Sequence, residues 1–497
     1  RKQDVINLLV LVLVATVIGV YLIATTVLIS KDGILYIEWA KMFSSNPMSV
    51  VKGLSFGYPL LIFVVHKLAT AFGADSSVFT WIYSAQSVTL LCRTLSLIPL
   101  YFIGKLLIGG RKSFWAILIL IALPHPTRYG SSILREWPHI LFLAVGFLSL
   151  LRGAKTGKQW MFGITGIASG LGHIIRPECV QLVFYGVSWI LISLLAPRQN
   201  MNRRALLGAL ALLLLGFATP AAPYMAVKGK ILPDKIKEYM DTYTLWESDR
   251  ISEPETDGDN TTLAVSGLLG KTAKALGEVA RELSDNLMHY FVPALVVGIY
   301  VRARKWSQVS RPERFFIPFF VFLNVAMMVL LHYRWGYMSR RHVLPLVLPA
   351  IFYVSLGLCV SARWLGGKFS RNREQSNWDS QRWFFILLAI GVCVCTPKLL
   401  GRLGADKQGY RDAGEWLRQN SQREDAIAVP DFRISFYAER KGIEYTTEVP
   451  EGVGYVVRIM RNEDEEMQFD GSGRKEFSAR MEKRKKNNKR VVIYKII

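Results

Sequence analysis

The sequence predicts a polytopic α-helical membrane protein, and two observations carry this prediction. Of its 497 residues, 51% are hydrophobic and only 20% are charged, whereas soluble proteins of this length usually have a lower apolar share and about a quarter charged residues. The apolar residues also gather in blocks long enough to cross a bilayer as helices. This pattern excludes an ordinary cytosolic enzyme, a disordered chain and a secreted disulfide scaffold.

Eleven apolar blocks predict about eleven transmembrane helices. The first, Val5–Ile29, has no charge and is longer than the apolar region of a cleaved signal peptide, so we expect an uncleaved helix. Pro59–Phe72 is too short to cross comfortably, and we expect an interfacial or re-entrant helix there. The other predicted crossings are Val78–Ile108, Phe114–Pro126, Trp137–Leu151, Trp160–Ile175, Cys179–Ala196, Ala205–Ala226, Leu287–Val301, Phe315–Leu331, Val343–Ala362 and Trp383–Leu400.

The distribution of basic residues predicts the orientation of these helices. Twenty lysines and arginines fall in one set of alternate short connections and six fall in the opposite set. We therefore expect the first set, and with it the N-terminus, to lie in the cytoplasm. The same bias accounts for about a third of the 61 Lys and Arg. The formal charge of +23 thus gives little reason to expect a nucleic-acid partner.

Three segments are predicted to lie outside the cytoplasm. Two are loops of the membrane domain, which covers residues 1–400: residues 30–77, and residues 227–286, where apolar residues near the end follow helical spacing. The third is the tail, residues 401–497, in which charge rises and short runs typical of a small α/β domain alternate. The strand-like runs are Ala426–Val429, Gly454–Ile459 and Arg490–Ile497, and the helix-like runs are Gly414–Arg418, Phe436–Arg440 and Lys475–Lys485.

Charged side chains collect at the predicted external helix ends, although the positive-inside bias disfavours basic residues there. Because helix ends on one face can meet in one cavity, we predict a site that binds an anion and performs acid–base chemistry. For any single residue, the alternative is that it only lines the headgroup region. The residues are Lys31, Asp32, Glu38, Arg128, Tyr129, Arg135, Glu136, His173, Arg176, Glu178, His332, Tyr333, Arg334, Arg340, Arg341 and His342.

Asp32 follows the first predicted crossing directly. An aspartate in this position can cap a helix over Gly33–Met42 or serve as a catalytic carboxylate, and position alone does not separate the two roles. Glu38 lies six residues further on, so the two carboxylates do not share a helical face. We do not expect them to act as a pair.

Short motifs follow one another in a fixed order along the membrane part. They are Lys31-Asp32-Gly33 with Tyr36 and Ala40, Tyr58-Pro59-Leu60, Tyr129-Gly130-Ser131 through Leu134-Arg135-Glu136, Arg176-Pro177-Glu178, Pro223-Tyr224, and Ser339-Arg340-Arg341-His342 before Leu344-Pro345. In this order and topology the chain resembles the GT-C superfamily of membrane glycosyltransferases. The closer resemblance is to bacterial glycosyltransferase family 39, the group similar to protein mannosyltransferases and lipid A aminoarabinose transferases.

The resemblance implies a GT-C fold and the transfer of a sugar from a polyprenyl phosphate to an acceptor hydroxyl. Transfer would take place outside the cytoplasmic membrane of a bacterium, with inversion at the anomeric carbon, and the acceptor would be a lipid, a glycan or a protein. It implies Asp32 as the catalytic base. Many relatives have a second acidic residue directly after this aspartate, but here Gly33 stands in that position. Glu136 is the best substitute for the missing carboxylate.

The departing phosphate of such a donor needs cations, because stabilising developing charge usually supplies the largest catalytic term. Arginine suits this task because its planar fork matches phosphate oxygens and stays charged. No cofactor is required by the sequence, although His and Glu near the external face permit a divalent metal. The predicted phosphate-binding residues are Arg340, Arg341 and His342, then Arg135 and Arg176, with Tyr58, Tyr129, His173 and Glu178 in support.

Two other classes of protein stay open at this stage. A secondary transporter would carry its charges near the bilayer midplane and show two related halves, and the sequence shows neither feature. A protein that handles lipid-linked sugars without catalysis would keep the same scaffold. Replacing Asp32 by Asn separates these classes, because only a transferase would lose sugar transfer while still folding.

Overall fold

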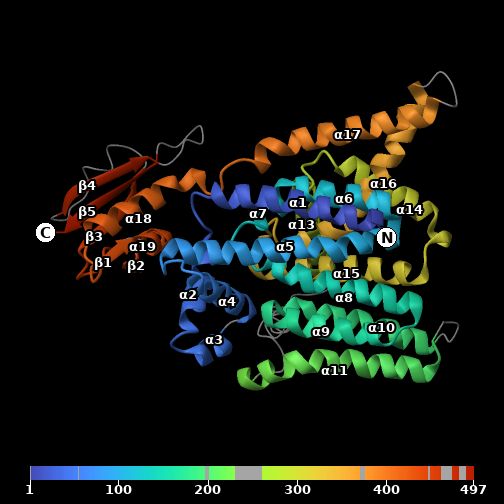
Figure 1. Cartoon of the computed structure of the whole chain (residues 1–497), viewed down its shortest axis with the longest axis horizontal. Helices are drawn as coiled ribbons and strands as arrows, with labels where there is room; N and C mark the ends of the chain where they lie inside the picture. The colour runs from blue at the N-terminus through green and yellow to red at the C-terminus, as the bar shows by residue number, and fades with distance from the viewer. Residues whose placement is uncertain are drawn as a thin grey trace.

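The computed structural model describes residues 2–53, 55–195, 201–229, 260–369, 375–445, 448–460, 473–480 and 489–496. Each of the eleven predicted crossings overlaps a helix in this part of the chain (Figure 1). Eight spans are at least 18 residues long and apolar enough to cross a bilayer. They lie in α1 (Lys2–Ala24), α5 (Val78–Ile108), α8 (Glu136–Thr156), η1 with α10 (Pro177–Val180 and Gln181–Leu195), α11 (Arg203–Lys228), α15 (Arg311–Trp335), α16 (Leu344–Phe369) and α17 (Gln375–Leu399).

The remaining three predicted blocks lie on shorter apolar helices, so the polytopic helical fold is confirmed. These helices are α6 (Gly110–Ala122), followed by the short α7 (Pro124–Tyr129), α9 (Trp160–Ile175) and α14 (Val292–Arg304), followed by η2 (Trp306–Gln308). Close backbone contact shapes one pair: α14 and α16 cross where Gly298 faces Gly357, and a Cβ on either residue would strike the backbone of the other helix.

The predicted external loop at residues 30–77 folds into three helices, α2 (Lys31–Met42), α3 (Pro47–Gly53) and α4 (Gly57–Ala71). Ser30 caps α2, because its hydroxyl accepts a hydrogen bond from the Gly33 amide. The aspartate that follows is therefore not needed as the cap. α4 is the short helix that the sequence predicts, and it packs against α5 through buried residues such as His66, which stacks on Trp81 with ring centroids 3.5 Å apart.

The second predicted external segment is described only in part, because residues 230–259 lie outside the described residues. Its end forms α13 (Asn260–Asn286), as the helical spacing predicts. Val279 is buried together with Met328 of α15 and Leu346 of α16. α13 is therefore packed onto the bundle by its apolar face.

The tail forms a five-stranded sheet with two helices, drawn in red and orange at one end of Figure 1. The strand order is β2-β1-β3-β5-β4, with β1 parallel to β2 and β3, and β5 antiparallel to β3 and β4. The elements are η3 (Ala405–Lys407), α18 (Gln408–Asn420), β1 (Ala426–Val429), α19 (Phe432–Ala438), β2 (Lys441–Glu444), β3 (Tyr455–Met460), β4 (Gly473–Arg480) and β5 (Arg490–Ile496).

One predicted helix of the tail is wrong. The run Lys475–Lys485 is helix-like in sequence, but its described part belongs to strand β4, and residues 481–488 lie outside the described residues. β4 is an edge strand whose apolar anchor is Phe477, stacked on Trp416 of α18 at 5.6 Å. With so few buried positions, a polar edge strand has no alternating pattern that sequence could reveal.

The sheet domain rests on the segment that leads from α1 into α2. The amide of Val27 donates to the carbonyl of Leu403 at 2.8 Å, and the amide of Ile29 donates to the hydroxyl of Tyr437 at 3.4 Å. Ile37 of α2 belongs to the same buried cluster as Tyr437. We call this end of the bundle, where α2 and the sheet lie, the α2 end; the N-terminus lies at the opposite end (Figure 1).

Candidate active site

Asp32 stands in the first turn of α2 and forms an ion pair with Arg341. Arg341 comes from the connection between α15 and α16, so the pair joins the first loop of the chain to the last crossings. The Asp32 side chain is 42% exposed. Its carboxylate is therefore held on one side by a guanidinium and is open on the other, which leaves room for a substrate group to approach.

A second charged cluster centres on Arg176, just after α9. Its Nε donates to Glu178 at 3.1 Å and its Nη1 lies 3.7 Å from Glu136. Burial alone would lower the pKa of Arg176, but the two carboxylates raise it above its usual value. One oxygen of Glu136 is buried and accepts no hydrogen bond from the described residues. This oxygen can accept a hydrogen bond from a substrate hydroxyl.

Tyr36 links the two clusters. It lies one helical turn after Asp32, on the same face of α2, and its ring meets that of Tyr58 edge-on at 5.1 Å. Burial raises the pKa of the Tyr36 phenol, and the charges of Arg135, Glu136, Asp32 and Arg176 all act on it. The pKa of Arg341 is raised as well: burial opposes the shift, while the bond to Asp32 and the charge of Glu136 cause it.

The structure thus brings six predicted site residues into one electrostatic environment at the α2 end. Tyr129 borders it, since burial raises its pKa to about 12 and the charges of Arg340, Glu136 and Arg341 act on it. Tyr36 belongs to the motif that begins at Lys31, but it is not among the predicted site residues. Its spacing of four from Asp32 was the available signal. The six residues are Asp32, Arg135, Glu136, Arg176, Glu178 and Arg341.

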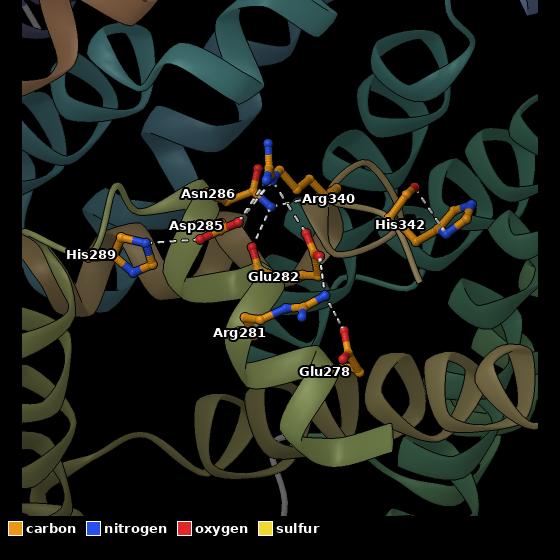
Figure 2. A network of polar contacts seen from close by, with 9 residues as sticks. Glu278, Arg281, Glu282, Asp285, Asn286, His289, Arg340 and His342 are labelled. Carbon is orange, nitrogen blue, oxygen red and sulfur yellow. Dashed lines mark hydrogen bonds and ion pairs between the residues drawn. The ribbon is translucent and has the colours of Figure 1, made fainter. Parts of the chain in front are cut away.

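Arg340 points away from this environment, toward α13. Figure 2 shows its guanidinium beside Asp285 and Glu282, with Nη2 2.9 Å from Asp285 and Nε 3.5 Å from Glu282. The side-chain amide of Asn286 also donates to the Arg340 carbonyl at 3.0 Å. These acidic residues of α13 are not among the predicted site residues, because their spacing along one helix does not reveal which cation they meet.

The other predicted residues lie around the two clusters. His342 contacts Ser339 through Nδ1 at 3.4 Å (Figure 2). Tyr58 is fully buried, and its hydroxyl forms a 2.7 Å hydrogen bond with Thr89 of α5. His173 is buried with its ring against Phe217 and Tyr224, at 5.8 and 6.0 Å. Tyr58 and His173 therefore support the helices that carry the site.

Two grooves are large enough to hold part of a substrate, and the second of them borders α2. One, of about 840 Å³, has an almost entirely apolar lining between α13, α14, α15 and α16, including Val279, Leu283, Phe322 and Val325. The other, of about 690 Å³, lies between α2 and α19 and has a mixed lining. Among the described residues, no three His, Cys, Asp or Glu side chains lie close enough together to hold a metal ion. The described part of the chain therefore offers no ready ligand set for the divalent metal that the sequence permits.

Comparison with known proteins agrees with the polytopic helical fold. The family model described as dolichyl-phosphate-mannose-protein mannosyltransferase matches residues 58–222, which include Arg135, Glu136 and Arg176. ArnT from Cupriavidus metallidurans, solved bound to undecaprenyl phosphate, is similar with a TM-score of 0.55 and 12% identity, over 98% of this chain and 97% of that chain. The chain has the GT-C fold.

A second solved structure gives the same result for the GT-C fold. The archaeal oligosaccharyltransferase AglB from Archaeoglobus fulgidus, in complex with an inhibitory peptide and a dolichol-phosphate, has a TM-score of 0.55 and 14% identity. The similarity covers 90% of this chain and 69% of that chain. No curated protein matches the sequence. The GT-C fold expected from the sequence is therefore confirmed, and the family model, which covers about a third of the chain, agrees with it.

Proposed function

We propose that the protein transfers a sugar from a polyprenyl-phosphate donor to an acceptor hydroxyl, with inversion and with Asp32 as the base. We place the reaction on the non-cytoplasmic side of a bacterial inner membrane. The observation that carries the proposal is the ion pair of a half-exposed Asp32 with Arg341, next to the buried Arg176 cluster. A carboxylate and several guanidinium groups on one face are what phosphate departure and hydroxyl activation require.

Asp32 accepts the proton of the acceptor hydroxyl in this proposal. Its exposed side gives the hydroxyl room to approach, and Arg341 holds the carboxylate in place. The oxygen of the hydroxyl then attacks the anomeric carbon on the face opposite the phosphate, and the bond from that carbon to the phosphate oxygen breaks. The configuration at the anomeric carbon is inverted by this single displacement.

The leaving phosphate is stabilised by the arginines on the other side of the reacting carbon. Arg341 is paired with Asp32, and Arg176 is already paired with two carboxylates, those of Glu136 and Glu178. Arg135 makes no ion pair with the described residues, and it is near enough to Tyr36 for its charge to act on the phenol. We therefore assign Arg135 as the first contact of the phosphate and Arg341 as the group that links phosphate and base.

The two grooves suit the remaining parts of the substrates. The apolar groove between α13 and α16 has the lining that a prenyl tail needs, and a lipid tail can enter it sideways from the bilayer. Lys31, which directly precedes Asp32, lines the groove between α2 and α19, and we assign this groove to the acceptor. Leu35 and Glu38 of α2 and Phe432 and Phe436 of α19 also line it.

A comparison of two carboxylate variants tests the proposal. The full chain in vesicles receives a lipid extract with radiolabelled polyprenyl-phosphate sugars and cell-envelope acceptors, and label in the acceptor fraction is measured. Asp32→Asn is expected to lower transfer by about 10²–10⁴-fold, the usual contribution of a positioned base. Glu451→Gln is the matched control, because Glu451 is an exposed carboxylate of the sheet domain and lines neither groove.

Both variants should retain undecaprenyl phosphate equally, as measured by native mass spectrometry. Transfer by Asp32→Asn at the normal rate would remove the catalytic assignment. Label that crosses the vesicle membrane without joining an acceptor would instead identify a transporter, and retention of the lipid without either activity would identify a non-catalytic protein.

A further inference from the structure

A cationic hollow lies at the end of the bundle opposite Asp32. It has a volume of about 490 Å³ and forms where α5 ends and α6 begins, against the last turns of α16 and the beginning of α17. The 31 residues of α5 separate it from the α2 end, since α5 begins beside α2 and α4 and finishes at the hollow. At a rise of 1.5 Å per residue this is roughly 46 Å. The hollow is therefore distinct from the proposed sugar-transfer site.

Three cations line the hollow: Arg111 and Lys112 from the first turn of α6, and Arg363 from α16. The thiol of Cys359 lines the same hollow, and the charges of all three cations act on it. None of the three forms an ion pair with the described residues, and no described carboxylate belongs to the lining. Asp4, a carboxylate in the adjoining hollow that Arg111 also lines, is already paired with Lys105 at 2.6 Å, so the three like charges favour an anionic ligand.

The backbone at the start of α6 adds to this positive field. Gly109 precedes the helix with φ +87°, and no side chain caps the first amide groups. A Cβ on Gly109 would meet nothing within 4 Å, so the backbone here is open to a ligand. An uncapped helix N-terminus favours negative charge, in the same direction as the three side chains.

Aromatic rings form the other wall. Trp115 lies 5.6 Å from Phe384 and 5.4 Å from Phe385, measured between ring centroids, and Phe385 is 46% exposed. From this wall, exposed Ile386, Ile390 and Val394 continue along α17 at intervals of four residues. Cations beside aromatic rings and a row of exposed apolar residues suit a ligand that has an anionic head and hydrocarbon chains. A soluble anion would contact only the cations.

We propose that this hollow binds the phosphate headgroup of an anionic phospholipid, with the acyl chains along α17. Basic pockets between transmembrane helices, bordered by interfacial aromatic residues, have the chemistry for such headgroups. The lipid lies at the end of the bundle that carries the N-terminus and the excess of basic residues. Its role is to hold α6, α16 and α17 together at that end, where Ser355 of α16 already donates to the Lys112 carbonyl at 2.8 Å.

Lipid retention by the full chain tests this site. The protein is purified in neutral detergent, supplied with phosphatidylglycerol or phosphatidylcholine, and analysed by native mass spectrometry. The test variant is Arg111→Gln/Lys112→Gln/Arg363→Gln. The matched control, Lys158→Gln/Arg203→Gln/Arg204→Gln, removes three exposed cations from the same end outside the hollow. The test variant is expected to bind phosphatidylglycerol about fivefold more weakly for each cation removed, with a smaller difference at high salt.

Each outcome decides for or against the site. Weaker phosphatidylglycerol binding in the test variant alone, with phosphatidylcholine unaffected, supports it. Equal binding in the test and control variants overturns it, provided that both elute as the folded monodisperse chain does. In a third arm inorganic phosphate competes with the lipid: full displacement at millimolar concentration would overturn the lipid assignment and leave a soluble-anion site. Single substitutions of Arg363 serve if the triple variant does not fold.

Discussion

Arg341 and Asp32 are 309 positions apart in the chain and form an ion pair at the α2 end of the bundle. The Arg341 guanidinium contacts the proposed base, and the charge of Glu136 also acts on it. The ion pair therefore connects the Asp32 side of the site to the Arg176 cluster. A phosphate that binds beside Arg341 would share this guanidinium with the carboxylate. Arg341 would then influence both proton transfer and phosphate departure.

The first prediction concerns the charge and the shape of Arg341. Arg341→Gln removes a group that faces both the base and the phosphate, and we expect transfer to fall by about 10²–10³-fold, as for a lost transition-state donor. Arg341→Lys keeps the charge but loses the planar fork, so its transfer rate should lie between that of Arg341→Gln and that of the unaltered chain. Initial rates at several donor concentrations provide the measurement. Equal rates for Arg341→Gln and the unaltered chain would contradict this role.

The second prediction separates Arg340 from its neighbour. Arg340 is 42% exposed and bound to Asp285, so its ion pair contributes at most about 1 kcal/mol and positions α13. We expect Arg340→Gln and Asp285→Asn to lower transfer by about fivefold at most. The exchange Arg340→Asp/Asp285→Arg should recover part of this loss. If Arg340→Gln is instead as damaging as Arg341→Gln, then Arg340 leaves α13 and contacts the phosphate, as the sequence predicts.

Hydropathy predicted the membrane part of the fold well because it is a local property. A run of apolar residues forms a spanning helix whatever its neighbours are, and each of the eleven predicted blocks overlaps a helix. The central strands β1, β3 and β5 were predicted for the same reason, since they are buried and rich in branched residues. Strands β2 and β4 were missed because they lie at the two edges of the sheet, where few of their side chains are buried.

The partners of the charged residues could not be predicted in this way. The sequence indicates that Arg340 and Arg341 lie at a helix end, but two adjacent side chains point in different directions, one to Asp285 and one to Asp32. Which carboxylate each meets depends on the packing of α13 and α2, which is a tertiary property. The pairing of Arg176 with Glu178 was within reach, because the two residues are only two positions apart.

The third prediction concerns the stability of the Arg176 cluster. Arg176→Gln removes the cation that pairs with the buried Glu136 and the partly exposed Glu178, and breaking a buried pair in this way costs about 3–5 kcal/mol. Glu136→Gln leaves Arg176 paired with Glu178 and should destabilise the protein less. Thermal unfolding in detergent measures both. Adding Glu136→Gln and Glu178→Gln to Arg176→Gln should restore part of the stability. If it does not, the loss of stability in Arg176→Gln comes from altered packing and not from the unpaired charges.

The fourth prediction links pH to the contact between the sheet domain and α2. Asp431 caps α19 through the Arg433 amide at 3.1 Å, accepts from the Arg433 guanidinium at 2.7 Å, and lies 3.6 Å from Lys31, the neighbour of Asp32. Burial alone would raise the pKa of Asp431, but the hydrogen bonds and charge of Arg433 lower it below its usual value. The carboxylate therefore stabilises the folded state when it is ionised.

This stabilisation is present above the unfolded-state pKa of about 3.9 and is lost as the pH falls through the lower folded-state value. Asp431→Asn should consequently unfold at a lower temperature than the unaltered chain at pH 7, and the difference should shrink as the pH falls below about 4. Asp406→Asn, which removes an exposed carboxylate from the same domain, should show no such difference. If the effect of Asp431→Asn is as large at pH 3 as at pH 7, the carboxylate contributes through its shape and not through its charge.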